Sequence, residues 1–147
     1  MERASRDSII RRLEFARTEL ADLGDFGDLE FSRYTSDRLV RRNVERIIEN
    51  VVNSLSDIGE IILSQADIEM PESYRDIFTK LASLGLIDPN LSTRLADATR
   101  LRNVLAHQYL DIKWEYIKAF LTQGRSDAQA FLDRIEEWMA AEDAGPG

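Results

Sequence analysis

The side chains best able to do chemistry lie within eight residues, around the only histidine of the chain: Arg102, Asn103, His107 and Tyr109. On a helix, Asn103 and His107 share a face because they are four residues apart, and Arg102 and Tyr109 share a neighbouring face if the helix reaches that far. Histidine transfers protons near neutral pH, and arginine stabilises negative charge on phosphate. These two residue types suit attack by an RNA 2′-hydroxyl on the adjacent phosphate, with His107 as general base and Arg102 stabilising the phosphorane.

The same segment also has a purely structural interpretation. A single histidine near a helix end often caps backbone carbonyls, and Arg102 could pair with a nearby carboxylate such as Asp97 or Asp111. Ion pairs of that kind shift the pKa values of side chains as readily as active sites do. Residue types and spacing alone therefore favour the structural interpretation over the catalytic one.

Metal and cofactor chemistry finds few ligands in this sequence. Cysteine is absent and histidine occurs once, so no Cys/His set can hold zinc. The sequence also lacks the glycine-rich loops that bind nucleotide phosphates and the G-x-S-x-G and H-E-x-x-H motifs of hydrolases. We expect no metal and no cofactor, and the mechanism with histidine and arginine requires neither.

Hydrophobic residues recur at helical spacing along most of the chain, and no strand-like alternation persists. The predicted helices span about 5–23, 36–65, 73–84, 88–105, 112–123 and 126–141, with a loop over 28–35. Ser73 and Asp111 are expected to cap two of these helices, and Gly124 to end one. The helix over 36–65 needs partner helices along its length. We therefore predict an all-α, up-and-down bundle of four to six helices, with a single domain over 1–141 and a flexible tail over 142–147.

The net charge of −8 arises after residue 46, because acidic and basic residues balance before it. An acidic protein is a poor general binder of nucleic acid, so any RNA contact must use a local basic cleft. Arg38, Arg42 and Arg46 step by four along the long helix and are candidates for phosphate contact. At least one of them is expected to pair with Glu45 or Glu49 instead.

The cellular location is read from what the sequence lacks. The N-terminal segment has no apolar stretch typical of a signal peptide, and no run of about 18 apolar residues occurs. We expect no membrane contact and a cytoplasmic location, where the acidic surface aids solubility.

The segment Arg102-Asn103-x-x-x-His107-x-Tyr109 resembles the R-x-x-x-x-H-x-Y motif of HepT-like toxins in the HEPN superfamily. The polar residue directly after the arginine is also typical of that motif. The similarity extends to 34–38 with the long helix that follows, and to 107–112 with Trp114. Residues of the long helix that share in it are Arg42, Glu45, Arg46 and Asp57. The resemblance covers most of the chain, from about Ser5 to Met139.

This resemblance implies a HEPN-like helical bundle that forms a homodimer, with two copies of the motif facing one cleft. It also implies a metal-independent RNase in which Arg102 and His107 are catalytic and Asn103 supports them. Proteins of this type are typically toxins encoded beside a minimal nucleotidyltransferase antitoxin, which neutralises the toxin by attaching AMP to the tyrosine of the motif, here Tyr109. The long helix also favours a dimer, because isologous pairing is the commonest way to join two copies.

Two residues of the long helix bear on activity. Asp57 is a candidate to orient Arg102 or His107, and equally a candidate polar position at the dimer seam. Asn53 stands where family members often carry an acidic residue, and its presence would reduce activity if that residue orients the cleft. The alternative function is therefore a non-catalytic HEPN module that partners a nucleotidyltransferase or binds nucleotide.

Overall fold

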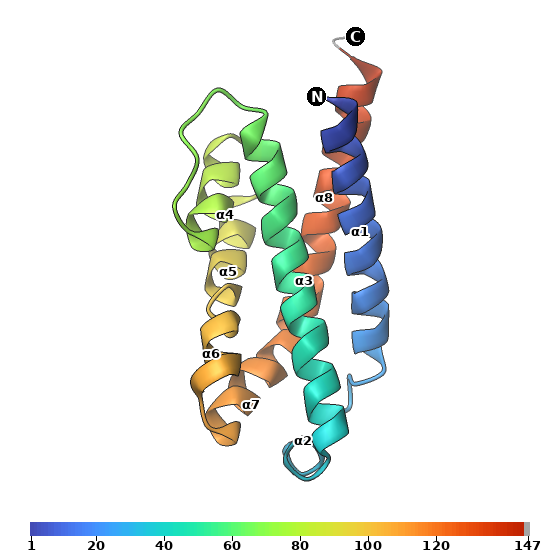
Figure 1. Ribbon diagram of the computed structural model, residues 1–147, viewed down its shortest axis with the longest axis vertical. Coiled ribbons are helices and arrows are strands. Elements are labelled where there is room, and N and C mark those ends of the chain that lie inside the picture. Colours follow the sequence, from blue (N-terminus) through green and yellow to red (C-terminus); the bar gives the residue numbers. More distant parts are fainter. Residues whose placement is uncertain (146–147) are drawn as a thin grey trace.

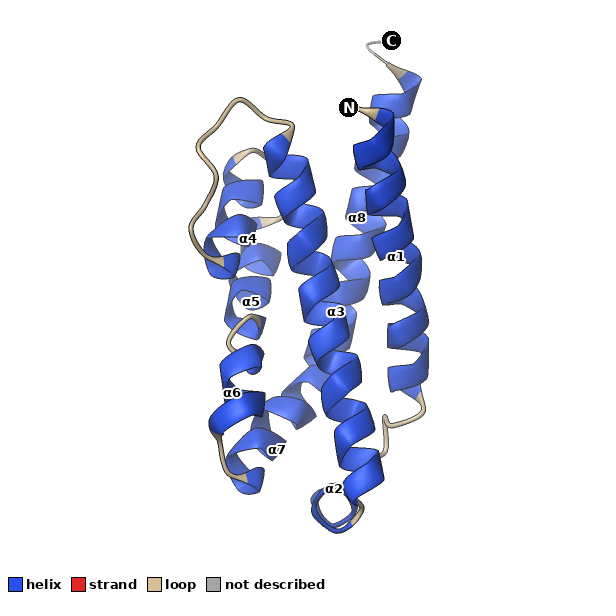
Figure 2. Cartoon of the chain, in the orientation of Figure 1, coloured by secondary structure: helices blue, strands red, loops and turns tan. Residues whose placement is uncertain are grey.

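The computed structural model describes residues 1–145, and its regular elements are all helical. They are α1 Arg3–Gly24, α2 Phe31–Ser36, α3 Arg38–Ser64, α4 Tyr74–Ser83, α5 Pro89–Ala98, α6 Leu101–His107, α7 Leu110–Ala119, the π-helical turn η1 Phe120–Gly124, and α8 Arg125–Ala144. No strand occurs among these described residues (Figure 2). The all-α bundle predicted from the periodicity is confirmed.

The longest helices, α1, α3 and α8, run along one axis, and α2 lies across one end of the bundle (Figure 1). α1 and α3 are antiparallel neighbours and make the most extensive contact between helices. α4 and α5 form a second antiparallel pair, and α6 continues the direction of α5 toward the end of the bundle where α2 lies. α7, η1 and α8 return along the axis to the end where the chain begins. This is the up-and-down arrangement predicted from the sequence.

α3 is the central helix of the bundle, because it contacts α1, α4 and α8. Its buried apolar stripe includes Val44, Ile48, Val51, Leu55, Ile58 and Ile62. Burial of each such side chain contributes about 1.5–3 kcal/mol to stability. At Gly59 the helices α3 and α4 approach so closely that a Cβ atom would lie 2.5 Å from Cγ2 of Ile77. This packing fixes α4 and, through α4, the neighbouring helices α5 and α6.

Side chains that accept backbone N–H bonds set the start of several helices. Asp37 caps α3 by accepting from the Val40 N–H at 3.1 Å, and Ser73 caps α4 by accepting from the Asp76 N–H at 3.2 Å. Asp88 caps α5 in the same way. The cap predicted at Ser73 is confirmed, and it fixes the residue at which α4 begins.

Two predicted boundaries differ in the first two thirds of the chain. The predicted loop over 28–35 contains most of helix α2. The predicted helix over 88–105 is divided into α5 and α6 at Thr99. The Thr99 hydroxyl donates to the Ala96 carbonyl at 2.6 Å, and such a bond competes with the regular helical ladder.

The junction between α7 and α8 also differs from the prediction. Asp111 does not cap α7, because the helix begins at Leu110 and the cap position is Tyr109. The helix end predicted at Gly124 is wrong as well, because a glycine stop signal uses positive φ and Gly124 has φ −61°. A Cβ atom at Gly124 would lie 2.5 Å from Cδ2 of Phe120, so glycine lets η1 close over this ring instead of ending the helix.

The C-terminal end of the chain is helical for longer than predicted. Helix α8 continues to Ala144, so residues 142–144 of the predicted tail belong to it. Residues 146–147 of the predicted tail lie outside the described residues. The single domain over 1–141 stays a prediction.

Candidate active site

Helix α6 presents the predicted catalytic pair to solvent. Its buried residues are Leu101 and Val104, which anchor one side of the helix in the core. Arg102, Asn103 and His107 are exposed on its other sides. α6 is seven residues long, buries two side chains and contacts α3 and α7.

Tyr109 follows α6 on extended backbone. The helix ends at His107, and Tyr109 has φ −68° and ψ 158°. Tyr109 therefore does not share a helical face with Arg102, as a longer helix would have required. Its side chain is 82% exposed, so its hydroxyl is open to a partner as large as another protein.

Arg102 forms no ion pair with a carboxylate anywhere in residues 1–145. Asp97, one partner of the structural interpretation, accepts instead from Arg75 Nη1 at 3.0 Å. The other, Asp111, is exposed and forms no ion pair in this part of the chain. The Arg102 guanidinium lies over the ring of Tyr74, with Cζ 4.6 Å from the ring centroid. Its positive charge is thus left uncompensated, which favours the catalytic interpretation.

The three arginines predicted to contact phosphate lie along the first turns of α3. Arg46 Nη1 is 3.7 Å from Oε2 of Glu49, so the prediction that at least one of them would pair with a neighbouring glutamate is confirmed. Arg38 and Arg42 are exposed, and neither forms an ion pair with the described residues. These two remain candidates for phosphate contact.

Glu45 pairs across the bundle rather than along its own helix. Lys113 Nζ of α7 lies 3.2 Å from Glu45 Oε1, and each side chain is 17% exposed. Loss of one partner from so enclosed a pair would leave an uncompensated charge. The pair therefore holds the start of α7, just after Tyr109, against α3.

An aromatic cluster of Phe31, Tyr34 and Trp114 joins α2 to α7. The ring centroids of Tyr34 and Trp114 are 5.3 Å apart, and those of Phe31 and Trp114 are 6.1 Å apart. The Tyr34 hydroxyl is buried and forms no hydrogen bond within the described chain. Burial raises the pKa of Tyr34, and the nearby Glu45 carboxylate raises it further, so the phenol stays protonated. The cluster supports the backbone that follows the motif.

Asp57 lies on the side of α3 that faces α1. Its Oδ2 is 3.8 Å from Nε of Arg12, and no hydrogen bond or ion pair within residues 1–145 joins it to α6. Asn53, one turn earlier, is half-buried. Within one copy of the chain, Asp57 is therefore not brought to Arg102 or His107.

Sequence reasoning did not single out Tyr74, whose ring lies against Arg102, or Lys113, which joins α7 to α3. Tyr74 is separated from Arg102 by all of α5, and no helical spacing relates residues so far apart. Lys113 carried no distinct signal, because Asp111, Glu115 and Lys118 of the same helix are charged as well and its anionic partner lies on another helix. The sequence alone could not name Glu45 as that partner.

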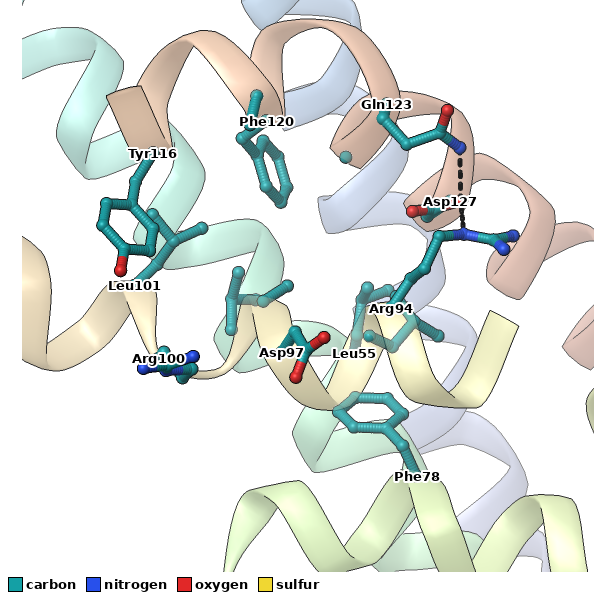
Figure 3. Close-up of a pocket in the computed structure, with 15 residues that line it drawn as sticks. Leu55, Phe78, Arg94, Asp97, Arg100, Leu101, Tyr116, Phe120, Gln123 and Asp127 are labelled. Carbon is teal, nitrogen blue, oxygen red and sulfur yellow. Dashed lines mark hydrogen bonds and ion pairs between the residues drawn. The ribbon is translucent and has the colours of Figure 1, made fainter. Parts of the chain in front are cut away.

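A separate cavity lies behind α6, between α5 and η1 (Figure 3). Its volume is about 280 Å³, and its lining is mainly apolar, with Leu101 and Phe120 among the side chains. Asp127 at its edge accepts from Arg94 Nε at 2.9 Å and from Gln123 Nε2 at 2.9 Å. None of the four motif side chains lines this cavity, so the candidate site is an open surface.

None of the helices in residues 1–145 has the length and apolar character of a membrane span. No group of three or more His, Cys, Asp or Glu side chains among residues 1–145 is arranged to hold a metal ion.

Solved structures of toxins, one of them named a HEPN toxin, have the same helical fold as this chain. The chain is similar to a tri-AMPylated HEPN toxin of Shewanella oneidensis solved in complex with an MNT antitoxin. The match covers 93% of this chain and 99% of the other, with a TM-score of 0.80 and 24% sequence identity. It is also similar to a toxin–antitoxin crystal structure with AMP-PNP, with TM-score 0.80 at 24% identity over 89% of this chain and 98% of that one. The HEPN-like fold is confirmed.

The sequence comparison gives the family. The family model described as ribonuclease HepT-like matches residues 16–135, and the chain belongs to this family. One curated relative is an mRNA nuclease HepT of Shewanella oneidensis, 28% identical over 105 residues, which are 71% of this chain and 79% of the relative. Another is a tRNA nuclease HepT of Aphanizomenon flos-aquae, 28% identical over 101 residues, which are 69% of each chain. The resemblance carried by the motif is confirmed.

Proposed function

We propose that this chain is the ribonuclease toxin of a toxin–antitoxin pair and that it cleaves RNA without a metal ion. The observation that carries this proposal is the exposure of Arg102 and His107 on α6, with no carboxylate paired to the arginine in the described chain. Membership of the ribonuclease HepT-like family supports the same reaction, as do relatives named mRNA nuclease and tRNA nuclease.

In the proposed reaction His107 accepts the proton of an RNA 2′-hydroxyl, and the 2′-oxygen forms a bond to the adjacent phosphorus. The bond from phosphorus to the 5′-oxygen then breaks, and this oxygen takes up a proton from water or from a protonated histidine. The products are a 2′,3′-cyclic phosphate and a 5′-hydroxyl. Arg102 donates to the phosphate oxygens, whose negative charge increases in the phosphorane, and the Asn103 amide adds a neutral donor.

The proposed active form is a homodimer. Arg102 and His107 lie on different faces of α6, because five residues correspond to about 140° of rotation. One open helix surface also excludes little water from a bound phosphate. Two α6 helices that face each other across a two-fold axis would enclose a single cleft, in which Arg102 of one copy approaches His107 of the other. In this arrangement Arg38 and Arg42 bind flanking phosphates.

The proposed partner is a minimal nucleotidyltransferase antitoxin, with Tyr109 as the acceptor of AMP. The Tyr109 oxygen attacks the α-phosphate of ATP, loses its proton and releases pyrophosphate. The 82% exposure of Tyr109 and the similarity to an AMPylated HEPN toxin with its MNT antitoxin support this modification. The added phosphate competes with RNA for Arg102. Both reactions are proposed for the cytoplasm.

The alternative is a non-catalytic module that partners the nucleotidyltransferase or binds nucleotide. The net charge of −8 supports this alternative because it repels RNA phosphates, and Asn53 supports it if an acidic residue at that position orients the cleft. The exposed Arg102 and His107 together favour the enzyme, because cleavage needs a base as well as a cation.

The test is RNA cleavage by the purified chain, with His107→Ala as the inactive control. We expect the wild type to cleave single-stranded RNA, and the variant to be slower by about 10²–10⁴. Equal cleavage by the two proteins would remove His107 from the mechanism. A folded, dimeric wild type that cleaves no RNA would favour the binding module.

A further inference from the structure

We propose that Tyr74 is a positioning residue for Arg102, whose guanidinium it holds by the face of its ring. This inference rests on the proposed ribonuclease function, and it adds to the site a residue from another helix. Tyr74 is the first residue of α4 and directly follows the Ser73 cap, so its backbone is held at a defined place.

The contact has the geometry of a cation over an aromatic ring. Arg102 Cζ lies 4.6 Å from the Tyr74 ring centroid, inside the range of about 6 Å over which the ring attracts a guanidinium. Tyr74 is 38% exposed, so the pair lies at the surface where RNA would approach. Within residues 1–145 no carboxylate forms an ion pair with Arg102, which makes the ring its observed anchor.

Helix α6 needs an anchor of this kind. Thr99 and Arg100 separate it from α5, and its seven residues bury two side chains in the core. A shift of about 1 Å in a group that contacts the reacting phosphate can cost about 10² in rate. A contact that fixes Arg102 from outside α6 therefore has a direct effect on catalysis.

The residue next to Tyr74 shows that the start of α4 spans the break between α5 and α6. Arg75 Nη1 donates to Asp97 Oδ1 at 3.0 Å, which joins the first turn of α4 to the last turn of α5. α4 is packed into the core by its buried Ile77 and Phe78. The same turn of α4 thus holds α5 by an ion pair and α6 by the Tyr74 ring.

An aromatic partner suits a phosphate-binding arginine better than a carboxylate does. A carboxylate would occupy the N–H donors of the guanidinium and oppose its charge. A ring contacts the face of the guanidinium and leaves the N–H groups in its plane free to bind phosphate. It also restricts the side chain to few rotamers, which lowers the entropy lost on binding RNA.

The test compares Tyr74→Phe, which keeps the ring, with Tyr74→Leu, which removes it. Leu84→Ala, at the opposite end of α4 and 44% exposed, is the surface control. We expect Tyr74→Leu to lower kcat by about 3- to 30-fold, the range of a cation–π contact, with KM changed by less than about two-fold. Tyr74→Phe should restore most of this activity, and Leu84→Ala should match the wild type. A raised KM with unchanged kcat would mean that the ring stacks on RNA, and would overturn the proposal.

A second measurement does not depend on activity. The ring current of Tyr74 should shift the NMR signals of the Arg102 Cδ protons upfield in the wild type and in Tyr74→Phe, and the shift should vanish in Tyr74→Leu. Loss of kcat in Tyr74→Phe while this shift persists would contradict the positioning role, because the ring would still lie over Arg102. A wild type that shows the shift but cleaves no RNA would refute the ribonuclease proposal itself, so the two failures are distinguishable. If Tyr74→Leu unfolds at a lower temperature than the wild type, Tyr74→Gln is used in its place.

Discussion

Arg102 and His107 lie near opposite ends of α6, and both side chains are exposed. We therefore expect the fold to survive His107→Ala and Arg102→Ala, since neither side chain contributes to the core. Each substitution should lower kcat by about 10²–10⁴, because one removes the base and the other the cation that stabilises the phosphorane. The double variant should be little slower than either single variant, because the effects of groups that act as a unit are not additive. Single-turnover cleavage rates measure this, and losses that multiply fully would show that the two groups act independently.

Tyr109→Phe separates cleavage from neutralisation. The substitution removes the hydroxyl and keeps the ring, so RNA cleavage should remain close to that of the wild type. Neutralisation by the nucleotidyltransferase should be lost, because the proposed acceptor of AMP is gone. Intact-mass measurement after incubation with the partner and ATP checks this. Equal mass gain on Tyr109→Phe and on the wild type would show that another residue is the acceptor.

At the scale of the elements, the π-helical turn η1 joins α7 to α8 without an intervening loop. Gly124→Ala should destabilise the chain by about 1–3 kcal/mol, because a Cβ atom there would lie 2.5 Å from the Phe120 ring. Gly27→Ala is the matched control, since its Cβ atom would lie 3.4 Å from the nearest atom, in ordinary contact. Urea unfolding of both variants measures the difference. Equal stability of Gly124→Ala and Gly27→Ala would show that η1 does not depend on glycine.

The major helices and the motif could be predicted because their signals are local. The stripe of α3 repeats at helical spacing, and Ser73 carries the chemistry of a cap. The helical state at Gly124 and the break at Thr99 could not be predicted, because each depends on a contact with one particular neighbour. For Gly124 the neighbour is the Phe120 ring, and for Thr99 it is the Ala96 carbonyl.

The candidate site also contains some residues that could be predicted from the sequence and others that could not. Arg102 and His107 could be identified from one short segment, as could the pairing of Arg46 with a glutamate one turn away. The Tyr74 ring that lies against Arg102 belongs to α4, and its place depends on how α4 packs against α3 and α5. Contacts between distant parts of the chain are set by the three-dimensional packing, and the spacing of residues carries no signal for them.

At the scale of the whole molecule, the acidic charge and the exposed motif both favour pairing with a second copy of the chain. We expect a homodimer in solution, because two copies can place two Arg102 side chains around one phosphate site where the net charge of −8 repels RNA. Light scattering at micromolar concentration measures the mass. A monomer under conditions in which the chain cleaves RNA would contradict the shared cleft.

The proposed mechanism is tested most directly by RNA cleavage by the wild type in excess EDTA, with Arg102→Ala as the control. Because His107 and Arg102 supply the base and the stabilising cation, we predict that cleavage persists within about two-fold and yields 2′,3′-cyclic phosphate ends, while Arg102→Ala remains slower by about 10²–10⁴. Loss of wild-type cleavage in EDTA, with recovery on addition of a divalent ion, would contradict it.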